Sequence, residues 1–125
     1  MPATSVFEYA IVRIVPRVER EEFINAGVVL CCPARRFLAA RLVLDRARLA
    51  AFAPWLDRLD LSEVQRHLDL IPLVCAGDPA TGSVGALPLR RRFDWLVAPR
   101  STVVQPSPVH AGLCHDPRTE LDRLF

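Results

Sequence analysis

Two long apolar runs, residues 6–15 and 23–32, constrain the fold of this chain more than any other feature. If the first run is extended, both of its alternating sets of side chains are apolar. One set is Phe7, Tyr9, Ile11 and Val15, and the other is Val6, Ala10, Val12 and Ile14. Such a strand is typical of the middle of a sheet that is covered on both faces. Pro16 and Pro33 cannot donate to a strand ladder, so they should end the two strands.

Residues 37–44 form a third candidate strand, with apolar residues alternating around an outward Arg41. The connections between the three runs are short. Short connections favour antiparallel neighbours, so the sequence predicts an antiparallel meander.

The rest of the chain carries helical patterns. Asp45 is a candidate N-cap for a helix bearing Leu49, Phe52, Leu56 and Leu59, which Pro54 should kink. Ser62 and Gln65 have capping-box spacing and predict the start of a second helix, distorted near its end by Pro72. A third helix is expected from Pro88 to Leu96, and a last short one after Asp116-Pro117.

Between these helices, residues 76–85 consist of turn-forming residues and predict a surface loop. Residues 101–105 predict a short strand, after which Pro106 and Pro108 favour an edge or irregular segment. The expected fold is therefore α+β, a single domain over residues 1–125 with an antiparallel sheet of three to four strands and three to four short helices packed on it. So few helices leave part of the sheet to be closed by residues 101–113, by a homodimer or by another partner.

Composition narrows the class of protein. The chain has 125 residues, is 51% hydrophobic and has a formal charge of +2, which is too small to indicate nucleic-acid binding by itself. All sixteen basic residues are arginine, which indicates a GC-rich genome. We find no signal-peptide pattern and no apolar run approaching the ~20 residues of a membrane span, so we expect a cytoplasmic protein.

The cysteines do not predict a metal site or a cofactor. Cys31, Cys32, Cys75 and Cys114 show no CxxC spacing, and adjacent Cys114 and His115 rarely share one ion. In a cytoplasmic chain we expect reduced thiols, with Cys31 and Cys75 buried.

The first candidate site lies in the predicted hairpin. If Pro16 and Glu22 bracket its turn symmetrically, Arg13 faces Asn25 and Ile11 faces Gly27, which would leave space beside the guanidinium. A buried arginine must be paired or hydrogen-bonded. Arg13 therefore has either a structural partner, such as Glu8 or Glu22, or a ligand.

The second candidate site lies within residues 90–113. Arg90, Arg91 and Arg92 would spread over roughly 200° of a helix, so they cannot form one anion clamp. Arg92, on the buried side, could meet an anionic surface together with Arg100 and Arg90. Trp95 and Ser101 beside them are further candidate binding residues. The alternative is a solvated helix with a charged C-terminal cap.

Gln105, Ser107 and His110 complete this second group. A serine and a histidine without an identifiable acid to orient them make a poor catalytic triad, so we assign no catalytic residue. A nucleic-acid surface built from Arg35, Arg36, Arg41, residues 90–92 and Trp95 is a weaker alternative, because acidic residues are interleaved throughout.

Two motif groups carry a resemblance over essentially the whole chain. The first is Tyr9-x-x-Val12-Arg13-x-x-Pro16 followed by Glu22-Phe23-x-Asn25-x-Gly27. The second is Arg92-Phe93-x-Trp95-Leu96-x-Ala98-Pro99-Arg100-Ser101 followed by Gln105-x-Ser107-Pro108-x-His110. In this order they resemble the domain of unknown function 3037 family of short bacterial proteins. The resemblance implies no established activity, but it implies a partner, since members are often encoded beside a HipA-like kinase.

These observations favour a non-enzymatic binding or accessory module that acts on a protein partner. The alternative is a small-molecule or phosphate-binding enzyme that uses Arg13 and Asn25 together with Arg92, Arg100 and His110. A pocket lined by several of these side chains would favour the enzyme, whereas a flat apolar patch rimmed by them would favour the binding module.

Overall fold

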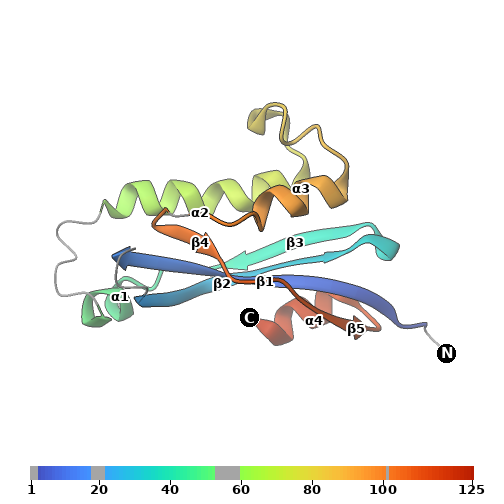
Figure 1. The fold of residues 1–125 in the computed structure, drawn as a ribbon, viewed down its shortest axis with the longest axis horizontal. Helices are drawn as coiled ribbons and strands as arrows, with labels where there is room; N and C mark the ends of the chain where they lie inside the picture. The colour runs from blue at the N-terminus through green and yellow to red at the C-terminus, as the bar shows by residue number, and fades with distance from the viewer. Residues whose placement is uncertain (1–2, 18–21, 53–59, 101) are drawn as a thin grey trace.

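The computed structural model describes residues 3–17, 22–52, 60–100 and 102–125, and it has the predicted α+β architecture (Figure 1). Its antiparallel sheet contains five strands, and four helices pack around it. The strands are β1 (Ser5–Arg17), β2 (Glu22–Cys32), β3 (Phe37–Leu42), β4 (Val104–Pro106) and β5 (His110–Cys114). The helices are α1 (Arg46–Phe52), α2 (Leu61–Ala76), α3 (Leu89–Leu96) and α4 (Pro117–Leu124).

The first three strands form the expected meander, with β2 between β1 and β3. The other edge of β1 is shared by two strands, because β4 pairs with residues 12–14 and β5 pairs with residues 5–9. The extra strand accounts for the difference from the expected three to four. The chain beyond Pro106 was expected to be an edge or irregular segment, and it supplies β5 on this edge.

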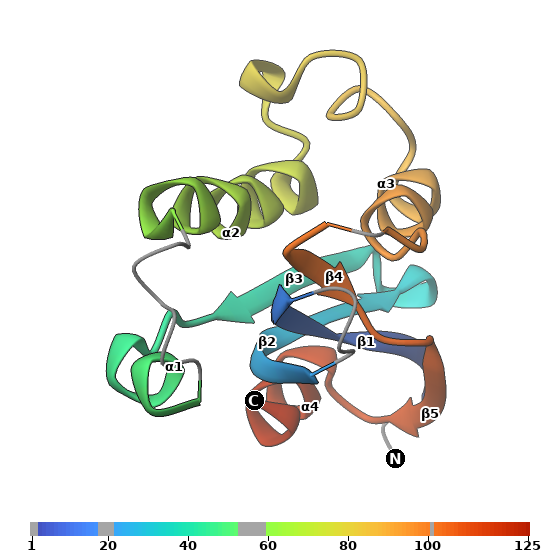
Figure 2. The same cartoon turned by 60° about the vertical axis from the view of Figure 1, so that its left-hand side comes forward.

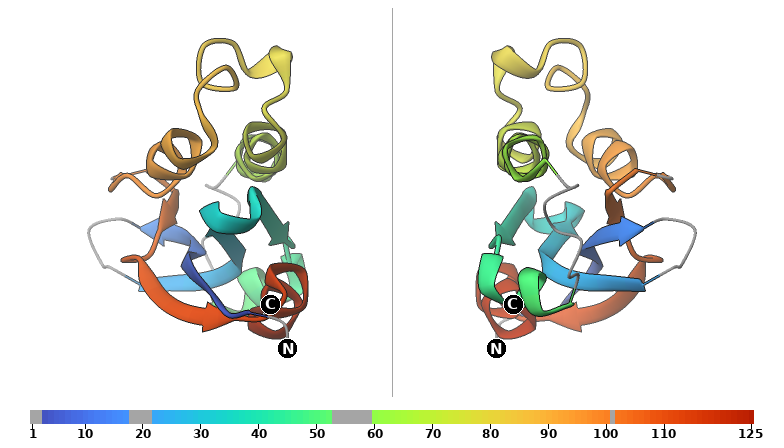
Figure 3. Two further views of the ribbon diagram at one scale, coloured as in Figure 1. Left: turned by 90° about the vertical axis from the view of Figure 1, so that its right-hand side faces the viewer. Right: turned by 90° about the vertical axis from the view of Figure 1, so that its left-hand side faces the viewer.

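The two faces of the sheet carry different helices. Figure 2 shows α2 and α3 on one side of the sheet and α4 on the other, and Figure 3 shows the same two layers from its ends. The α2/α3 side encloses the larger core, whose most buried members include Ile14, Leu49, Leu68 and Phe93. The α4 side encloses a smaller core around Leu30 and Leu121. Both faces of β1 and β2 are thus buried over most of their length, as their apolar runs predicted, but Phe23 and Asn25 are exposed on the α4 side of β2.

Two predictions about helix starts are resolved by hydrogen bonds. Asp45 caps α1 as expected, with its Oδ1 accepting from the Arg48 amide at 3.0 Å. Asp60, not Ser62, caps α2, and its Oδ1 accepts from the Glu63 amide at 3.1 Å. A carboxylate one residue before the first helical position is a competent cap, so the capping-box assignment was wrong.

Proline does not end α2. The helix continues to Ala76 beyond Pro72, and left-handed Gly77 then closes it by donating its amide to the Leu73 and Val74 carbonyls. The kink predicted at Pro54, with Leu56 and Leu59, lies outside the described residues. No helix among the described segments is long and apolar enough to cross a bilayer.

A β-bulge sets the register of the first hairpin. Arg13 pairs with Asn25 as predicted, but Ile11 pairs with Val28 and Val12 with Gly27. The register shifts between Val12 and Arg13, because Ala26 is an extra residue on β2. The predicted Ile11–Gly27 pairing is therefore wrong.

Gly27 also leaves no free space. A Cβ atom at this position would lie 2.1 Å from the Arg41 carbonyl oxygen and 2.7 Å from Leu42 Cδ2. The missing side chain allows β3 to approach β2 closely at the bulge.

Candidate functional site

Ser107 joins β4 and β5 into one edge. Its hydroxyl accepts a hydrogen bond from the Ile11 amide at 2.8 Å and donates one to the Pro108 carbonyl at 2.8 Å. Its own amide donates to the Ile11 carbonyl at 2.8 Å. The side chain therefore takes the place of a main-chain acceptor between two prolines, which explains why it is only 3% exposed.

Replacing Ser107 by alanine should lower the free energy of unfolding by about 1–3 kcal/mol, because the Ile11 amide would lose its acceptor inside the sheet. Urea denaturation would measure the change. Ser62→Ala is the matched control, since exposed Ser62 is not the cap of α2 and should change stability by no more than about 0.5 kcal/mol. Equal effects of the two substitutions would contradict this role for Ser107.

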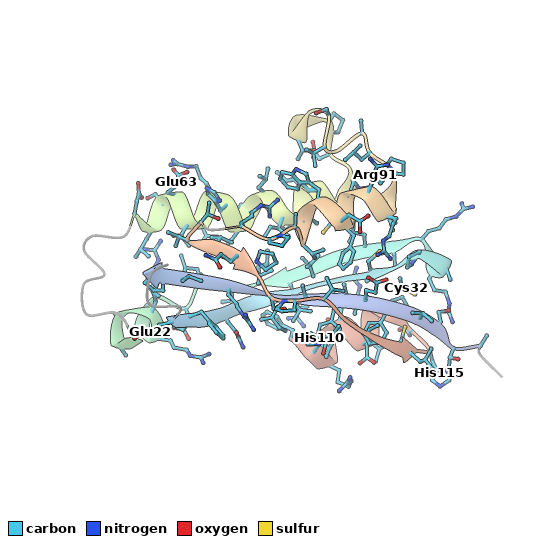
Figure 4. The ribbon with its side chains drawn as sticks, viewed as in Figure 1. Glu22, Cys32, Glu63, Arg91, His110 and His115 are labelled. Carbon is cyan, nitrogen blue, oxygen red and sulfur yellow. The ribbon has the colours of Figure 1, made fainter. Side chains whose placement is uncertain are left out.

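Arg90 and Arg92 both form hydrogen bonds to other residues of the chain. Arg90 forms a bidentate ion pair with Glu8, at 2.6 and 3.1 Å, and also contacts Asp94. Arg92 donates to the Leu87 carbonyl at 2.8 Å and to the Cys75 carbonyl at 3.4 Å. These bonds tie α3 to β1 and to the end of α2. Both guanidinium groups therefore already have acceptors within the chain, although the Arg90 side chain is 47% exposed. Arg91 is exposed on α3 (Figure 4).

A pocket of about 260 Å³ lies where α2, α3 and the segment before β4 meet; we call it the Trp95 pocket. Its lining comes from His67, Leu70 and Ile71 of α2, Trp95 and Leu96 of α3, and Arg100, Thr102 and Val104. Trp95 is 37% exposed and Leu70 is 40% exposed, so two large apolar side chains meet solvent at the same hollow. The pocket is thus an apolar hollow with polar groups at a few points of its wall.

Arg100 holds the polar part of this wall in place. Its Nη2 donates to the Trp95 carbonyl at 2.7 Å and its Nη1 to the Leu96 carbonyl at 3.2 Å, so the side chain caps α3. Its guanidinium carbon also lies 4.6 Å from the Trp95 ring centroid. Burial lowers the pKa of Arg100. The structure thereby includes the predicted charged C-cap, and it places that cap at a pocket.

A row of polar side chains crosses the opposite face of the sheet. Arg13 on β1 pairs with Asn25 on β2 and with Gln105 on β4, so the three side chains lie on one face; we call them the Arg13 row. Phe23 stacks on Arg13, with the guanidinium carbon 4.0 Å from its ring centroid. His110 lies farther along the same face, where its ring centroid is 5.3 Å from that of Tyr9. Figure 4 shows His110 on the α4 side of the sheet.

The predicted site residues therefore fall into two groups. Trp95 and Arg100 line the pocket on the α2/α3 side, whereas Arg13, Asn25, Gln105 and His110 lie on the α4 side. Ser101 lies outside the described residues. The prediction that Arg13 and Asn25 share one site with Arg92 and Arg100 is wrong. The first pair lies on the α4 side of the sheet and the second pair on the α2/α3 side. The single pocket that the enzyme alternative needed is therefore not formed by these residues.

Sequence reasoning missed the α2 half of the pocket. Leu70 lies away from the buried stripe of Val64 and Leu68 on α2, and its place in the pocket wall is visible only when α2 is packed beside α3. A large apolar residue off the buried stripe was the available signal.

The cysteines are consistent with a packing role. All four are buried, and the alternation at Cys31 and Cys32 places them in the two different cores. Burial raises the pKa of Cys31 to about 11 and that of Cys75 to about 12. Both thiols thus stay protonated near neutral pH and are poor nucleophiles. Among the described residues, no group of three His, Cys, Asp or Glu side chains could hold a metal ion.

The predicted basic and aromatic surface is divided among several parts of the structure. Arg35 bonds Ser5 and the Ala3 carbonyl, Arg41 pairs with Asp122, and Arg90 pairs with Glu8. Arginines occupied by internal partners have fewer donors for phosphates, so this arrangement does not favour the nucleic-acid alternative.

The comparisons with known proteins give one match. The family model described as "Protein of unknown function (DUF3037)" matches residues 9–125, nearly the whole chain. No curated protein and no solved structure matches this chain.

Proposed function

Because the chain belongs to the DUF3037 family, whose function is unknown, we propose a role from its geometry: a non-enzymatic module that binds a protein partner at the Trp95 pocket. The observation that carries this proposal is the exposure of Trp95 and Leu70 around an apolar hollow between α2 and α3. Exposed apolar side chains that gather around a concavity mark interaction sites. The occupant is an apolar anchor side chain of the partner.

The dimensions of the pocket support a single anchor. A volume of about 260 Å³ is close to the lower end of small-molecule pockets, which run from about 300 to 1,000 Å³. Burying a leucine- or phenylalanine-sized anchor contributes about 1.5–3 kcal/mol. Tryptophan and arginine are also enriched among the residues that dominate binding energy at protein interfaces, and here they stack on each other.

The partner that the family resemblance indicates is a HipA-like kinase, and we propose a kinase of this type as the source of the anchor. Substitution at the pocket should then weaken the complex without unfolding the module. The chain's net charge of +2 adds little long-range attraction to this mode of binding, which depends on apolar contact.

Trp95→Ala is expected to weaken binding of a purified HipA-like kinase by about 30-fold or more, a loss of about 2 kcal/mol. Removing the indole removes one wall of the pocket and the ring under Arg100. Isothermal titration calorimetry would measure the dissociation constant. Arg91→Ala is the matched control, since Arg91 is exposed on the same helix and is not among the pocket residues.

Leu70→Ser is a second pocket variant for the same binding experiment. It changes the wall that α2 contributes to the Trp95 pocket and leaves α3 and its cap unchanged. Weakened binding by both pocket variants, with the control within about twofold of the unsubstituted protein, would support the proposal. Unchanged affinity in both pocket variants would exclude the Trp95 pocket as the binding site. No binding by the unsubstituted protein would exclude a HipA-like kinase as the partner.

A further inference from the structure

Arg13 on β1 differs in its surroundings from Arg41 on β3 and Arg90 on α3. Its guanidinium is half-buried, and no hydrogen bond or ion pair joins it to another described residue. Its Nε atom is fully buried without an acceptor. By contrast, Arg41 pairs with Asp122 and Arg90 pairs with Glu8. A partly desolvated cation without an acceptor among the described residues is costly, so an acceptor supplied by a bound molecule would stabilise it.

The surroundings of Arg13 favour a planar anionic group. The Arg13 guanidinium carbon lies over the Phe23 ring, 4.0 Å from its centroid, so the ring covers one side of the cation. The side-chain amides of Asn25 and Gln105 flank it on the neighbouring strands. A guanidinium presents parallel N–H donors that match a carboxylate. The Asn25 amide can both donate and accept, whereas Gln105 Nε2 already donates to the Thr102 carbonyl at 2.6 Å and offers mainly its amide oxygen.

The row is also open to a macromolecule. The apolar cluster under α4 extends along the sheet as far as Val28 and Ile11 and does not include Arg13, Phe23 or Asn25. Phe23 is 42% exposed, and Asn25 is exposed. An uncovered stretch of sheet that combines an aromatic ring, two amides and a cation can contact several residues of an extended partner segment at once.

We propose that the Arg13 row binds a carboxylate side chain within an acidic segment of a protein, on the face opposite the Trp95 pocket. The carboxylate accepts from the Arg13 guanidinium, the flanking amides bond the segment beside it, and Phe23 supplies apolar contact. This surface is independent of the Trp95 pocket, because the sheet and the larger core lie between them. The module therefore has two faces and can contact two segments at the same time.

Side-chain amide resonances provide a direct test. Asn25 is the only asparagine in the chain, and Gln65 and Gln105 are the only glutamines. Gln65 lies on α2 and donates to Asp69 at 2.8 Å, so it is an internal control on the other side of the sheet. The probes are two twelve-residue peptides with alternating Glu and Thr or alternating Gln and Thr, titrated into the ¹⁵N-labelled protein at low salt.

The expected result is a saturable shift of the Asn25 and Gln105 amide signals with the Glu peptide, while the Gln65 signal stays in place. The Gln peptide should bind at least tenfold more weakly. Arg13→Met keeps an unbranched side chain against Phe23 but removes the charge, so it should abolish the response to the Glu peptide. Arg13→Lys should give an intermediate affinity, because an ammonium group keeps the charge without the planar fork.

Three outcomes would overturn the proposal. The first is equal binding of the Glu and Gln peptides, and the second is an unchanged Glu-peptide response in a folded Arg13→Met variant. The third is an equal response to inorganic phosphate at the same concentration, which would indicate a site for small anions instead of an acidic protein segment. The peptide titrations contain no kinase, so a failure of kinase binding at the Trp95 pocket does not change their outcome. The two proposals can therefore fail separately.

Discussion

Replacing Phe93 by alanine is expected to lower the free energy of unfolding by about 3–5 kcal/mol. Phe93 is 0% exposed and is among the largest fully buried side chains of the protein. It belongs to the larger core and attaches α3 to the sheet. Its loss would leave a cavity that neighbouring strands and helices can fill only in part, because protein interiors are closely packed.

Urea denaturation would test this expectation through the unfolding midpoint at an unchanged denaturant dependence. Arg91→Ala is again the matched control, since it changes an exposed residue of the same helix and should shift stability by no more than about 0.5 kcal/mol. A loss below about 1 kcal/mol for Phe93→Ala would contradict the assignment of α3 as an anchored element. Because Phe93 and Trp95 share this helix, the same variant should also weaken binding at the Trp95 pocket.

The sequence predicted the centre of the fold because the information there is local. Apolar side chains on both faces of residues 6–15 and 23–32 required a sheet with two covers, and the two cores lie on those faces. The Arg13–Asn25 pair was predicted from a turn bracketed symmetrically by Pro16 and Glu22, and the pair is observed although Glu22 pairs with Arg17 instead. The first residue of a helix was harder to predict. Asp60 and Ser62 are both plausible N-caps of α2, and only the hydrogen bond from the Glu63 amide to Asp60 distinguishes them.

The remaining features depend on contacts between distant segments. The strand β5 follows two prolines that argue against a strand, and it forms because the Ser107 hydroxyl replaces a main-chain acceptor for Ile11. The Trp95 pocket combines α2, α3 and the segment after α3, so no single stretch of sequence shows it. The separation of Arg92 and Arg100 from the Arg13 row follows from the side of the sheet that α3 covers. Periodicity along one segment does not determine that choice.

The bulge at Ala26 illustrates the same limit, and Gly27 beside it gives a second strong prediction. Gly27→Ala is expected to lower the free energy of unfolding by more than about 3 kcal/mol, above the usual range for one added methyl group. The new Cβ atom would lie 2.1 Å from the Arg41 carbonyl oxygen, within a backbone that pairs with β2. Backbone in a ladder cannot move aside without breaking hydrogen bonds, so β3 would have to separate locally from β2.

Gly112→Ala is the matched comparison, because it also adds a methyl group within the sheet. There the new Cβ atom would lie 2.8 Å from the Phe7 ring, and a side-chain ring can tilt while the strands remain paired. We therefore expect Gly112→Ala to be destabilising by about 1–3 kcal/mol and clearly less so than Gly27→Ala. Urea denaturation of both variants would rank them, and amide hydrogen exchange should show lost protection in residues 37–42 for the Gly27 variant alone. Equal stability of the two variants would mean that β2 and β3 are not held as closely at the bulge as the Gly27 contact requires.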